Sequence, residues 1–284
     1  MNAKRPGRLH GPAIATIAAL GLVAAGCGSD DESSSGGEGA KPAKVAIELS
    51  GSGRDLSFDV PKSVKGGLAR IEFTNSAKGT HGAQLVRAEA GHTAEAALEA
   101  ANAWGEQGKP LPDWAHTAGG VGDTPAGETA SVTQQLPAGE YMVVDLESET
   151  SAGFEVRGTG ATGEPSAQAT IGELEYEFQA KGLKAGSNPV LIDNRGSEPH
   201  FVLATPIKQG RTIADVREFV RSEKGEPPID EAAGVSTAVI DGGEKQAVQL
   251  DLESGNYALL CFVPDRKGGP PHAFKGMVSQ AVVR

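Results

Sequence analysis

The strongest constraint on how this 284-residue chain can fold is that its sequence repeats itself. Two segments, IEFTNSAKGTHGAQLVRAEAGHT from Ile71 and VLIDNRGSEPHFVLATPIKQGRT from Val190, align without gaps at an offset of 119 residues. A later pair, GETASVTQQLPAGEY from Gly127 and GEKQAVQLDLESGNY from Gly243, aligns at an offset of 116. Identical residues occupy matched positions of the first pair: Asn75 and Asn194, His81 and His200, Gly91 and Gly210, Thr93 and Thr212. Matching in chain order indicates a tandem duplication, with chance similarity of strand patterns as the alternative.

Each copy consists of short apolar or alternating runs bounded by Gly, Pro and Asn, which is typical of β-strands joined by turns. The strands expected in the first copy are LSFDV, ARIEF, AQLVRA, ASVTQQL and EYMVVDL. Those expected in the second are LEYEFQA, PVLIDN, HFVLATPI, QAVQLDL and NYALLCFV. This number of strands per copy predicts an all-β protein of two tandem β-sandwiches.

One short helix is expected to interrupt the strands of each copy. Thr93 precedes AEAALEAANAW and Thr212 precedes IADVREFVRS, and each threonine is followed by an acidic residue in the first turn. Threonine is a favourable N-cap because its hydroxyl accepts a free backbone N–H of the first turn. The second helix carries an apolar stripe that is expected to pack on the core: Ile213, Val216, Phe219 and Val220.

The N-terminus reads as an export signal. Three basic residues precede an apolar run over residues 13–25, which is too short for a membrane span. The following LVAAGC resembles the bacterial lipobox, with Ala24 where Leu is commonest, and the resemblance implies lipidation of Cys27. More than one acyl chain would anchor the protein stably to the extracytoplasmic face of the cell membrane. An ordinary secretory signal is the alternative.

Composition shifts suggest the domain boundaries. Residues 1–27 are predicted to be the lipoprotein signal peptide, and the acidic, Ser/Gly-rich residues 28–43 a disordered tether. The first domain is expected at 44–158, a linker at 159–168, and the second domain at 169–284. A monomer is expected.

Charge argues against a nucleic-acid or anionic-lipid surface. The leader holds three basic residues and no acidic ones, so the rest of the chain has 23 basic and 37 acidic residues, a formal charge of −14. Such a surface repels phosphate groups. It would instead steer a basic protein partner.

The two cysteines have different expected fates. With Cys27 lipidated, Cys261 has no partner for an internal disulfide and is either an inert buried thiol or a ligand. His272 follows it after ten residues and Met277 after four more, while His200 lies upstream behind Pro199. Two imidazoles, a thiolate and a thioether are the donor set of mononuclear blue-copper sites.

At this point the chain resembles the cupredoxin family, which includes plastocyanin and azurin. The resemblance lies in SEPHFV around His200 and in the Cys261, His272 and Met277 loop between the last two strands, and the first copy shares only the expected fold. It implies Greek-key sandwiches and one type 1 copper ion, with these four residues as ligands for electron transfer. Two features depart from the family pattern: the Cys-to-His loop is long, and Phe201 stands where many members have Asn.

The first copy lacks most of this donor set. Asp145 occupies the position of Cys261, and no His or Met follows it in LESETSAGFEV. His81 remains, whereas His92 and His116 are expected at exposed helix-start and loop positions. No second metal site is therefore expected, and the first domain is interpreted as a spacer, a docking surface for a partner or a degenerate relic.

Other chemistries fit less well. Zinc also binds Cys and His but Met poorly, and a nucleophilic Cys261–His272 pair lacks a visible orienting residue. A multicopper oxidase or nitrite reductase needs further histidines beside the ligand Cys, where Leu260 and Phe262 stand. We therefore expect no enzyme.

The alternatives to electron transfer are copper carriage or buffering with a copper-exchange partner, and a metal-free binding or assembly lipoprotein. Phe262, Phe274 and Pro271 are expected to keep a copper site dry.

Overall fold

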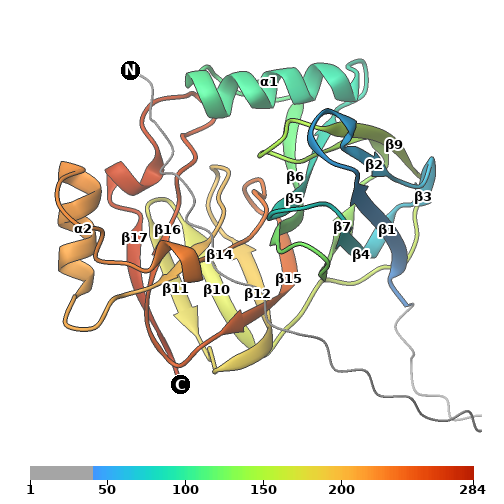
Figure 1. Ribbon diagram of the computed structural model, residues 1–284. Coiled ribbons are helices and arrows are strands. Elements are labelled where there is room, and N and C mark those ends of the chain that lie inside the picture. Colours follow the sequence, from blue (N-terminus) through green and yellow to red (C-terminus); the bar gives the residue numbers. More distant parts are fainter. Residues whose placement is uncertain (1–40) are drawn as a thin grey trace, which may run out of the picture. The chain divides into compact units, whose positions relative to one another are not determined.

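A computed structural model describes residues 41–284, in which most regular structure is β-strand (Figure 1). The predicted signal peptide, Cys27 and nearly all of the predicted tether lie outside the described residues. Within 41–284, neither α-helix is long and apolar enough to cross a membrane.

The elements follow the order expected from the repeat. The strands of the first half are β1 (Ala43–Ser50), β2 (Ser57–Asp59), β3 (Ser63–Lys65), β4 (Gly67–Asn75), β5 (His81–Ala88), β6 (Ala115–Thr124), β7 (Thr129–Leu136), β8 (Gly139–Val144) and β9 (Ser151–Arg157). The strands of the second half are β10 (Ala169–Leu174), β11 (Glu177–Lys181), β12 (Gly186–Asn194), β13 (Leu203–Pro206), β14 (Val235–Ser236), β15 (Lys245–Leu252), β16 (Gly255–Leu260) and β17 (Val278–Val283). The helices are α1 (Ala94–Gln107) and α2 (Ile213–Ser222), with 3-10 turns η1 (Gly53–Asp55), η2 (Glu231–Ala233) and η3 (His272–Lys275).

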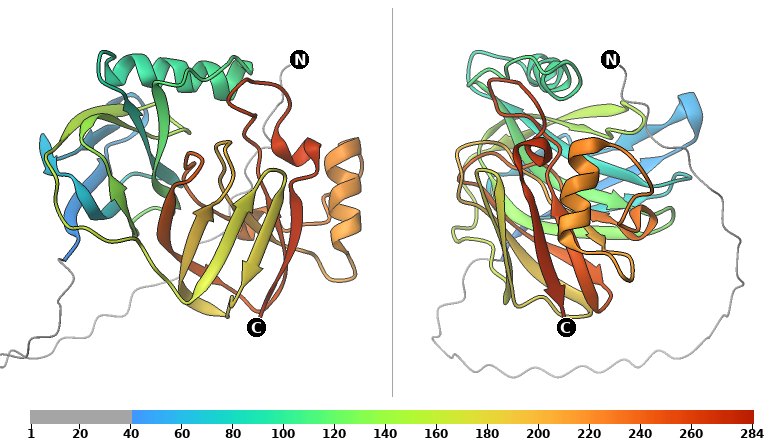
Figure 2. Two further views of the ribbon diagram at one scale, coloured as in Figure 1. Left: turned by 180° about the vertical axis from the view of Figure 1, so that it is seen from behind. Right: turned by 90° about the vertical axis from the view of Figure 1, so that its left-hand side faces the viewer.

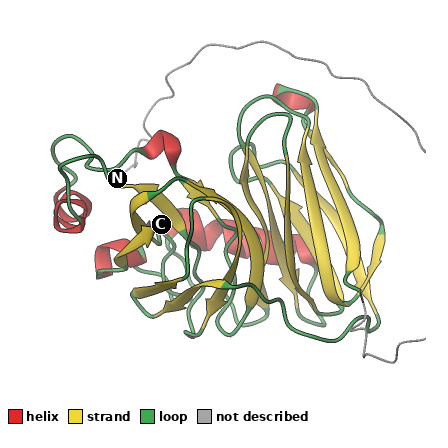
Figure 3. Ribbon diagram, turned by 90° about the horizontal axis from the view of Figure 1, so that it is seen from below, coloured by secondary structure: helices red, strands yellow, loops and turns green. Residues whose placement is uncertain are grey.

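The strands form three sheets, one of which runs through both halves. Its order is β11-β10-β12-β15-β7-β4-β1-β2, and the halves meet where β15 pairs antiparallel with β7. Each half adds a sheet of its own: β3-β9-β8-β5-β6 in the first and β14-β13-β16-β17 in the second. Figure 3 shows the strands of the first half in two layers. The all-β class is thus confirmed.

The core forms because inward-facing positions alternate along the strands. In β1 the buried residues are Val45, Ile47 and Leu49, at every second position, and they belong to one apolar cluster with Leu85 of the opposite sheet. Side chains two residues apart lie on one face of a strand, so this face is removed from water as the layers meet.

Both predicted helix starts are confirmed. The Thr93 hydroxyl accepts from the Ala96 N–H at 3.2 Å, and Thr212 forms a reciprocal capping box with Asp215. Helix α1 packs Trp104 into a cluster of first-half residues that also includes Val239 of the second half. Helix α2 packs the buried part of its stripe, Val216 and Val220, onto the second half.

One expected strand is interrupted. LEYEFQA was expected as a single strand, but β10 ends at Leu174 and β11 begins at Glu177, so this prediction was wrong. The chain turns back at Tyr176, whose φ of 66° lies in the left-handed region. The turn brings the Tyr176 hydroxyl to Asp265, at 3.1 Å from its Oδ1.

Candidate metal centre

Cys261 follows the last residue of β16, and the alternation of that strand sets its direction. Tyr257, Leu259 and Cys261 belong to the cluster between the sheets, whereas Ala258 and Leu260 belong to the cluster beneath α2. The thiol therefore points into the interior, where it is fully buried and unpaired.

His200 is held by backbone pairing. Its N–H donates to the Ile240 carbonyl at 3.0 Å, and its own carbonyl accepts from the Ile240 N–H at 2.9 Å. The Asn194 amide fastens the loop before His200 to the same segment, because its Nδ2 donates to the carbonyls of Glu198, Ile240 and Asp241. His200 is thus held by two backbone hydrogen bonds of the kind that pair antiparallel strands, although it lies before the start of β13.

His272 begins η3, at the far end of the long loop. Its N–H donates to the Val263 carbonyl at 3.0 Å, and the next N–H, of Ala273, donates to the Cys261 carbonyl at 2.7 Å. The His272 carbonyl accepts from the Met277 N–H at 2.9 Å. These bonds close the base of the loop, so its length does not carry His272 away from Cys261.

Three of the four predicted ligands converge. The Nδ1 atoms of His200 and His272 lie 3.7 and 3.5 Å from the Cys261 Sγ, and 3.0 Å from each other. All three residues are fully buried, and they are the only cluster of at least three His, Cys, Asp or Glu donors found in the described part of the chain.

These separations suit a shared ion. Metal bonds of about 2.0 Å to nitrogen and 2.3 Å to sulfur place their outer atoms about 3.7 Å apart at a trigonal angle of about 120°. Two nitrogen bonds of about 2.0 Å span about 3.0 Å at an angle near 100°. The donors present, two imidazoles and one thiol, therefore fit copper in both chemistry and spacing.

Burial sets the protonation states of these side chains in the absence of any ligand bond. It raises the pKa of the Cys261 thiol to about 12, although backbone hydrogen bonds from Phe201 and Val263 oppose this. Burial, followed by the neighbouring His272, lowers the pKa of His200 to about 4. Both effects disfavour charged forms in an apolar interior. At neutral pH the imidazoles are neutral and keep a lone pair for a ligand bond, while the thiol must release its proton on binding a metal.

The structure also places Met277, the fourth predicted ligand, and Phe201, the residue that departs from the family pattern. Met277 is fully buried in the same core cluster as Cys261, and its role as a ligand stays a prediction. The Phe201 contact with the thiol comes from its backbone N–H, so it does not need an Asn side chain at that position.

The apolar residues expected to keep the site dry are only partly buried. Phe262 and Phe274 are 39% and 42% exposed, and Pro271 is half-buried, so their role in excluding water stays a prediction. Tyr176 lies with its ring 5.5 Å from the His272 ring, in an edge-on arrangement.

Sequence reasoning missed Asp265, which orients His272. The His272 Nε2–H donates to the Asp265 Oδ1 at 3.0 Å, and the carboxylate is also bound by Lys275 and Tyr176. A proton fixed on Nε2 leaves the lone pair on Nδ1, the atom that faces Cys261. Although burial raises the pKa of Asp265, its bonds to Lys275 and Tyr176 outweigh this and keep it low.

Sequence reasoning also missed Glu173. It is fully buried, and neither carboxyl oxygen has a hydrogen-bond partner among the described residues. Burial, followed by the charge of Asp193, raises its pKa well above the usual value. Its position two residues after the core residue Ile171 is the signal that could have found it, because such spacing directs both side chains inward.

In the first half, the position that matches Cys261 carries a hydrogen-bonded carboxylate in place of a metal-ligand sulfur. Asp145 accepts from the His81 Nδ1–H at 2.8 Å, from the Gly82 N–H at 3.0 Å and from the Ser148 hydroxyl at 2.6 Å.

The prediction that His116 lies in an exposed loop was wrong. It lies in β6, and its side chain is 20% exposed because it pairs with Asp241 and Glu89.

Comparison with known proteins gives only weak likenesses. No protein-family model and no curated protein matches the chain. Reduced auracyanin from Roseiflexus castenholzii is 18% identical over 42% of this chain and 99% of its own, with a TM-score of 0.27. Auracyanin A, a "blue" copper protein from Chloroflexus aurantiacus, is 26% identical over 40% and 99%, with a TM-score of 0.25. The copper nitrite reductase from Nitrosomonas europaea is 11% identical over 86% and 94%, with a TM-score of 0.24. Likenesses this weak carry no argument about the function of the chain.

Proposed function

We propose that this chain binds one copper ion at His200, Cys261 and His272, with Met277 as the axial ligand, and transfers single electrons through it. The observation that carries the proposal is the convergence of three fully buried donors at separations that a shared ion requires. A copper ion bound there would alternate between its two common oxidation states.

The chain's own residues suit that task because they hold the donors in place. Backbone bonds fix His200 against Ile240 and His272 against Val263, and Asp265 fixes the His272 ring. Donors that cannot move far favour a geometry that changes little when an electron enters or leaves. Their full burial also opposes rapid release of the ion, which favours electron transfer over carriage.

The proposal includes no substrate turnover. The neighbours of Cys261, Leu260 and Phe262, offer no imidazole to lead electrons to a second metal centre. Tyr176, whose ring contacts His272, is partly exposed, as are Phe262 and Phe274, which lie one residue after Cys261 and two after His272 in the chain. The acidic chain would attract a basic redox partner to such a surface.

We further propose attachment to the extracytoplasmic face of the membrane through lipidated Cys27. The support is the lipobox-like LVAAGC and the polar segment that follows it. Cys27→Ser should move the protein from the membrane fraction to the soluble fraction of expressing cells. Retention of the variant on membranes would contradict the anchor.

The test of the copper site uses the chain from residue 28 on, loaded with one equivalent of Cu(II). We expect an intense thiolate-to-copper band in the visible spectrum and a narrow hyperfine pattern in the electron-spin spectrum, both absent from Cys261→Ser. Reversible one-electron cycling with slow copper release supports electron transfer, whereas rapid hand-over to a chelator supports carriage. Failure to bind Cu(II) would overturn both.

A further inference from the structure

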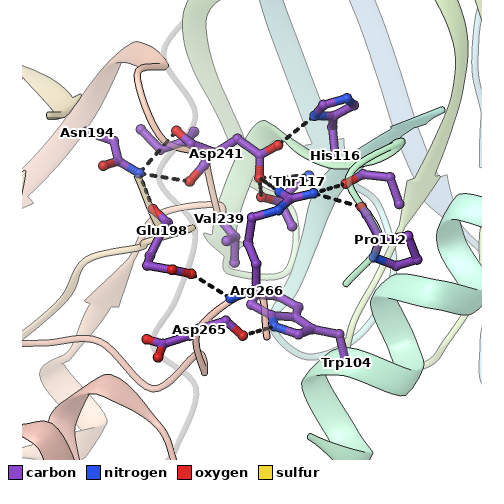
Figure 4. Close-up of polar contacts among 12 residues, drawn as sticks. Trp104, Pro112, His116, Thr117, Asn194, Glu198, Val239, Asp241, Asp265 and Arg266 are labelled. Carbon is purple, nitrogen blue, oxygen red and sulfur yellow. Dashed lines mark hydrogen bonds and ion pairs between the residues drawn. The ribbon is translucent and has the colours of Figure 1, made fainter. Parts of the chain in front are cut away.

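The segment between Cys261 and His272, residues 262–271, is called the ligand loop here. Its two ends are closed by the backbone bonds of its own half, but its middle contacts the first half of the chain. Figure 2 shows the red loop reaching α1. The contacts fall into three groups, drawn in part in Figure 4.

The first group comes from α1 and the turn behind it. The Trp104 Nε1–H donates to the Asp265 carbonyl at 2.7 Å, and the Leu111 N–H donates to the Arg266 carbonyl at 2.6 Å. Trp104 is 3% exposed, so if the bond to the Asp265 carbonyl were broken, water could not readily reach the indole N–H and replace that acceptor. Two consecutive carbonyls of the ligand loop are thereby fixed by the first half.

The second group is the Arg266 side chain, which extends into the first half (Figure 4). Its Nη2 donates to the carbonyls of Pro112 and Ala115, both at 2.8 Å, and its Nη1 donates to the Asp241 Oδ1 at 3.0 Å. Asp241 in turn accepts from the Thr117 hydroxyl at 2.6 Å. A guanidinium with several fixed acceptors holds one orientation more strictly than a single hydrogen bond does.

The third group is a close approach of backbones. A Cβ added to Gly268 would lie 2.1 Å from the carbonyl oxygen of Gly108, the C-cap of α1. Only glycine permits this approach. The neighbouring Gly269 has a similarly positive φ, yet a Cβ there would meet no atom within 4 Å.

Asp265 connects these contacts to the donors. Its carbonyl is bound by Trp104, and its carboxylate accepts the Nε2–H of His272. A displacement of the ligand loop would therefore move the group that orients the His272 ring.

We propose that the first half of the chain is a clamp that fixes the ligand loop and, through Asp265, orients His272 toward the shared donor point. Trp104 of the first half and Arg266 of the ligand loop are the positioning residues that join the two. The clamp replaces the spacer and relic interpretations of the first half. Its effect on copper rests on the proposed function, whereas its effect on the loop does not.

The experiment compares two matched pairs in the chain from residue 28 on, which holds Cys261 as its only thiol. Gly268→Ala breaks the close approach, and Gly269→Ala carries the same kind of backbone strain without it. Trp104→Phe removes one donor from the clamp, and Trp114→Phe is the same substitution at the tryptophan that stacks on His92.

The first readout needs no metal. The rate at which a small thiol reagent modifies Cys261 under native conditions should rise roughly tenfold in Gly268→Ala and Trp104→Phe, as expected for loss of a buried contact. It should stay within about twofold in the two controls. Equal rates within each pair would overturn the clamp, and so would a lower unfolding midpoint with unchanged modification.

The second readout is the copper-loaded protein. Gly268→Ala and Trp104→Phe should shift the thiolate-to-copper band and release copper roughly tenfold faster than their controls. Unchanged band and release would overturn the link to His272. Absence of the band from the unmodified protein would instead defeat the proposed function, and the modification rates would still decide the clamp.

Discussion

The ends of β8 and β16 occupy matching places in the two halves, and they differ in how their polar groups are satisfied. After β8, the Asp145 carboxylate accepts from His81, Gly82 and Ser148, so the cluster is complete within the chain. After β16, the Cys261 thiol faces the Nδ1 atoms of two buried imidazoles. The first arrangement stabilises a fold, whereas the second leaves donors for a metal.

The surrounding scaffolds are alike, which isolates that difference. Asn75 and Asn194 each donate to the carbonyl four residues ahead and to a carbonyl across the sandwich. Tyr141 and Tyr257 each bond, through the hydroxyl, to the backbone four residues behind. Such paired contacts agree with the duplication that the sequence predicts, which stays a prediction.

The largest expected effect comes from making the second site resemble the first. Cys261→Asp removes the thiolate, so the visible band should vanish and copper affinity should fall by more than about 100-fold, exceeding the loss typical of an outer-shell change. Titration with Cu(II) under a competing chelator measures this. Retention of the intense band would show that Cys261 is not the ligand.

Glu173, unlike Asp145, is a buried carboxyl without a hydrogen-bond partner among the described residues, and its titration should weaken the fold. Its raised pKa means that the folded protein holds a proton that the unfolded chain has lost above about pH 4.5. Stability is therefore complete at lower pH and falls as pH rises, by up to about 1.4 kcal/mol per pH unit, until the folded pKa is passed. Metal-free Glu173→Gln should lack this loss.

The measurement is urea unfolding of wild type and variant across pH, compared as a difference. His200 acts in the opposite direction, because its pKa near 4 gives stability that is lost as pH falls below 6.5. Since both proteins keep His200, the difference isolates Glu173. A difference that does not change with pH would contradict the assignment.

Asp145→Asn tests whether the first half is held by its hydrogen-bonded cluster. Removing the charge weakens the bonds from His81 and Ser148 and should lower the free energy of unfolding by about 2 kcal/mol, the size expected for bonds to a charged group. The copper spectrum should not change. Asp113→Asn, at an exposed loop position, is the control and should have little effect. Equal stability of the two variants would remove the structural role given to Asp145.

Met277→Leu is expected to have the smallest effect. The side chains have similar volume, so the fully buried position should lose less than about 1.5 kcal/mol. The visible band should remain while the reduction potential shifts, because a weak axial ligand tunes the potential. Voltammetry of the loaded protein measures the shift, and an unchanged potential would exclude Met277 as a ligand.

The sequence predicted the parts that depend on local pattern. Threonine caps, apolar alternation and the end of β16 led to both helices, the all-β class and the position of Cys261. It missed the turn at Tyr176, where the backbone takes a left-handed conformation that a strand-like pattern does not reveal. Asp265 and the exposure of Phe262 depend on how the long loop packs against the other half, which no local pattern encodes.

The central claim is that one copper ion lies between two imidazole nitrogens and one thiolate, and copper-edge X-ray absorption of the loaded chain measures this directly. We predict one short sulfur neighbour at about 2.3 Å and two nitrogen neighbours at about 2.0 Å, the bond lengths used above for a shared ion. This short thiolate sulfur contribution should be absent from Cys261→Ser. A spectrum of the unmodified protein that contains only nitrogen and oxygen neighbours would contradict the account.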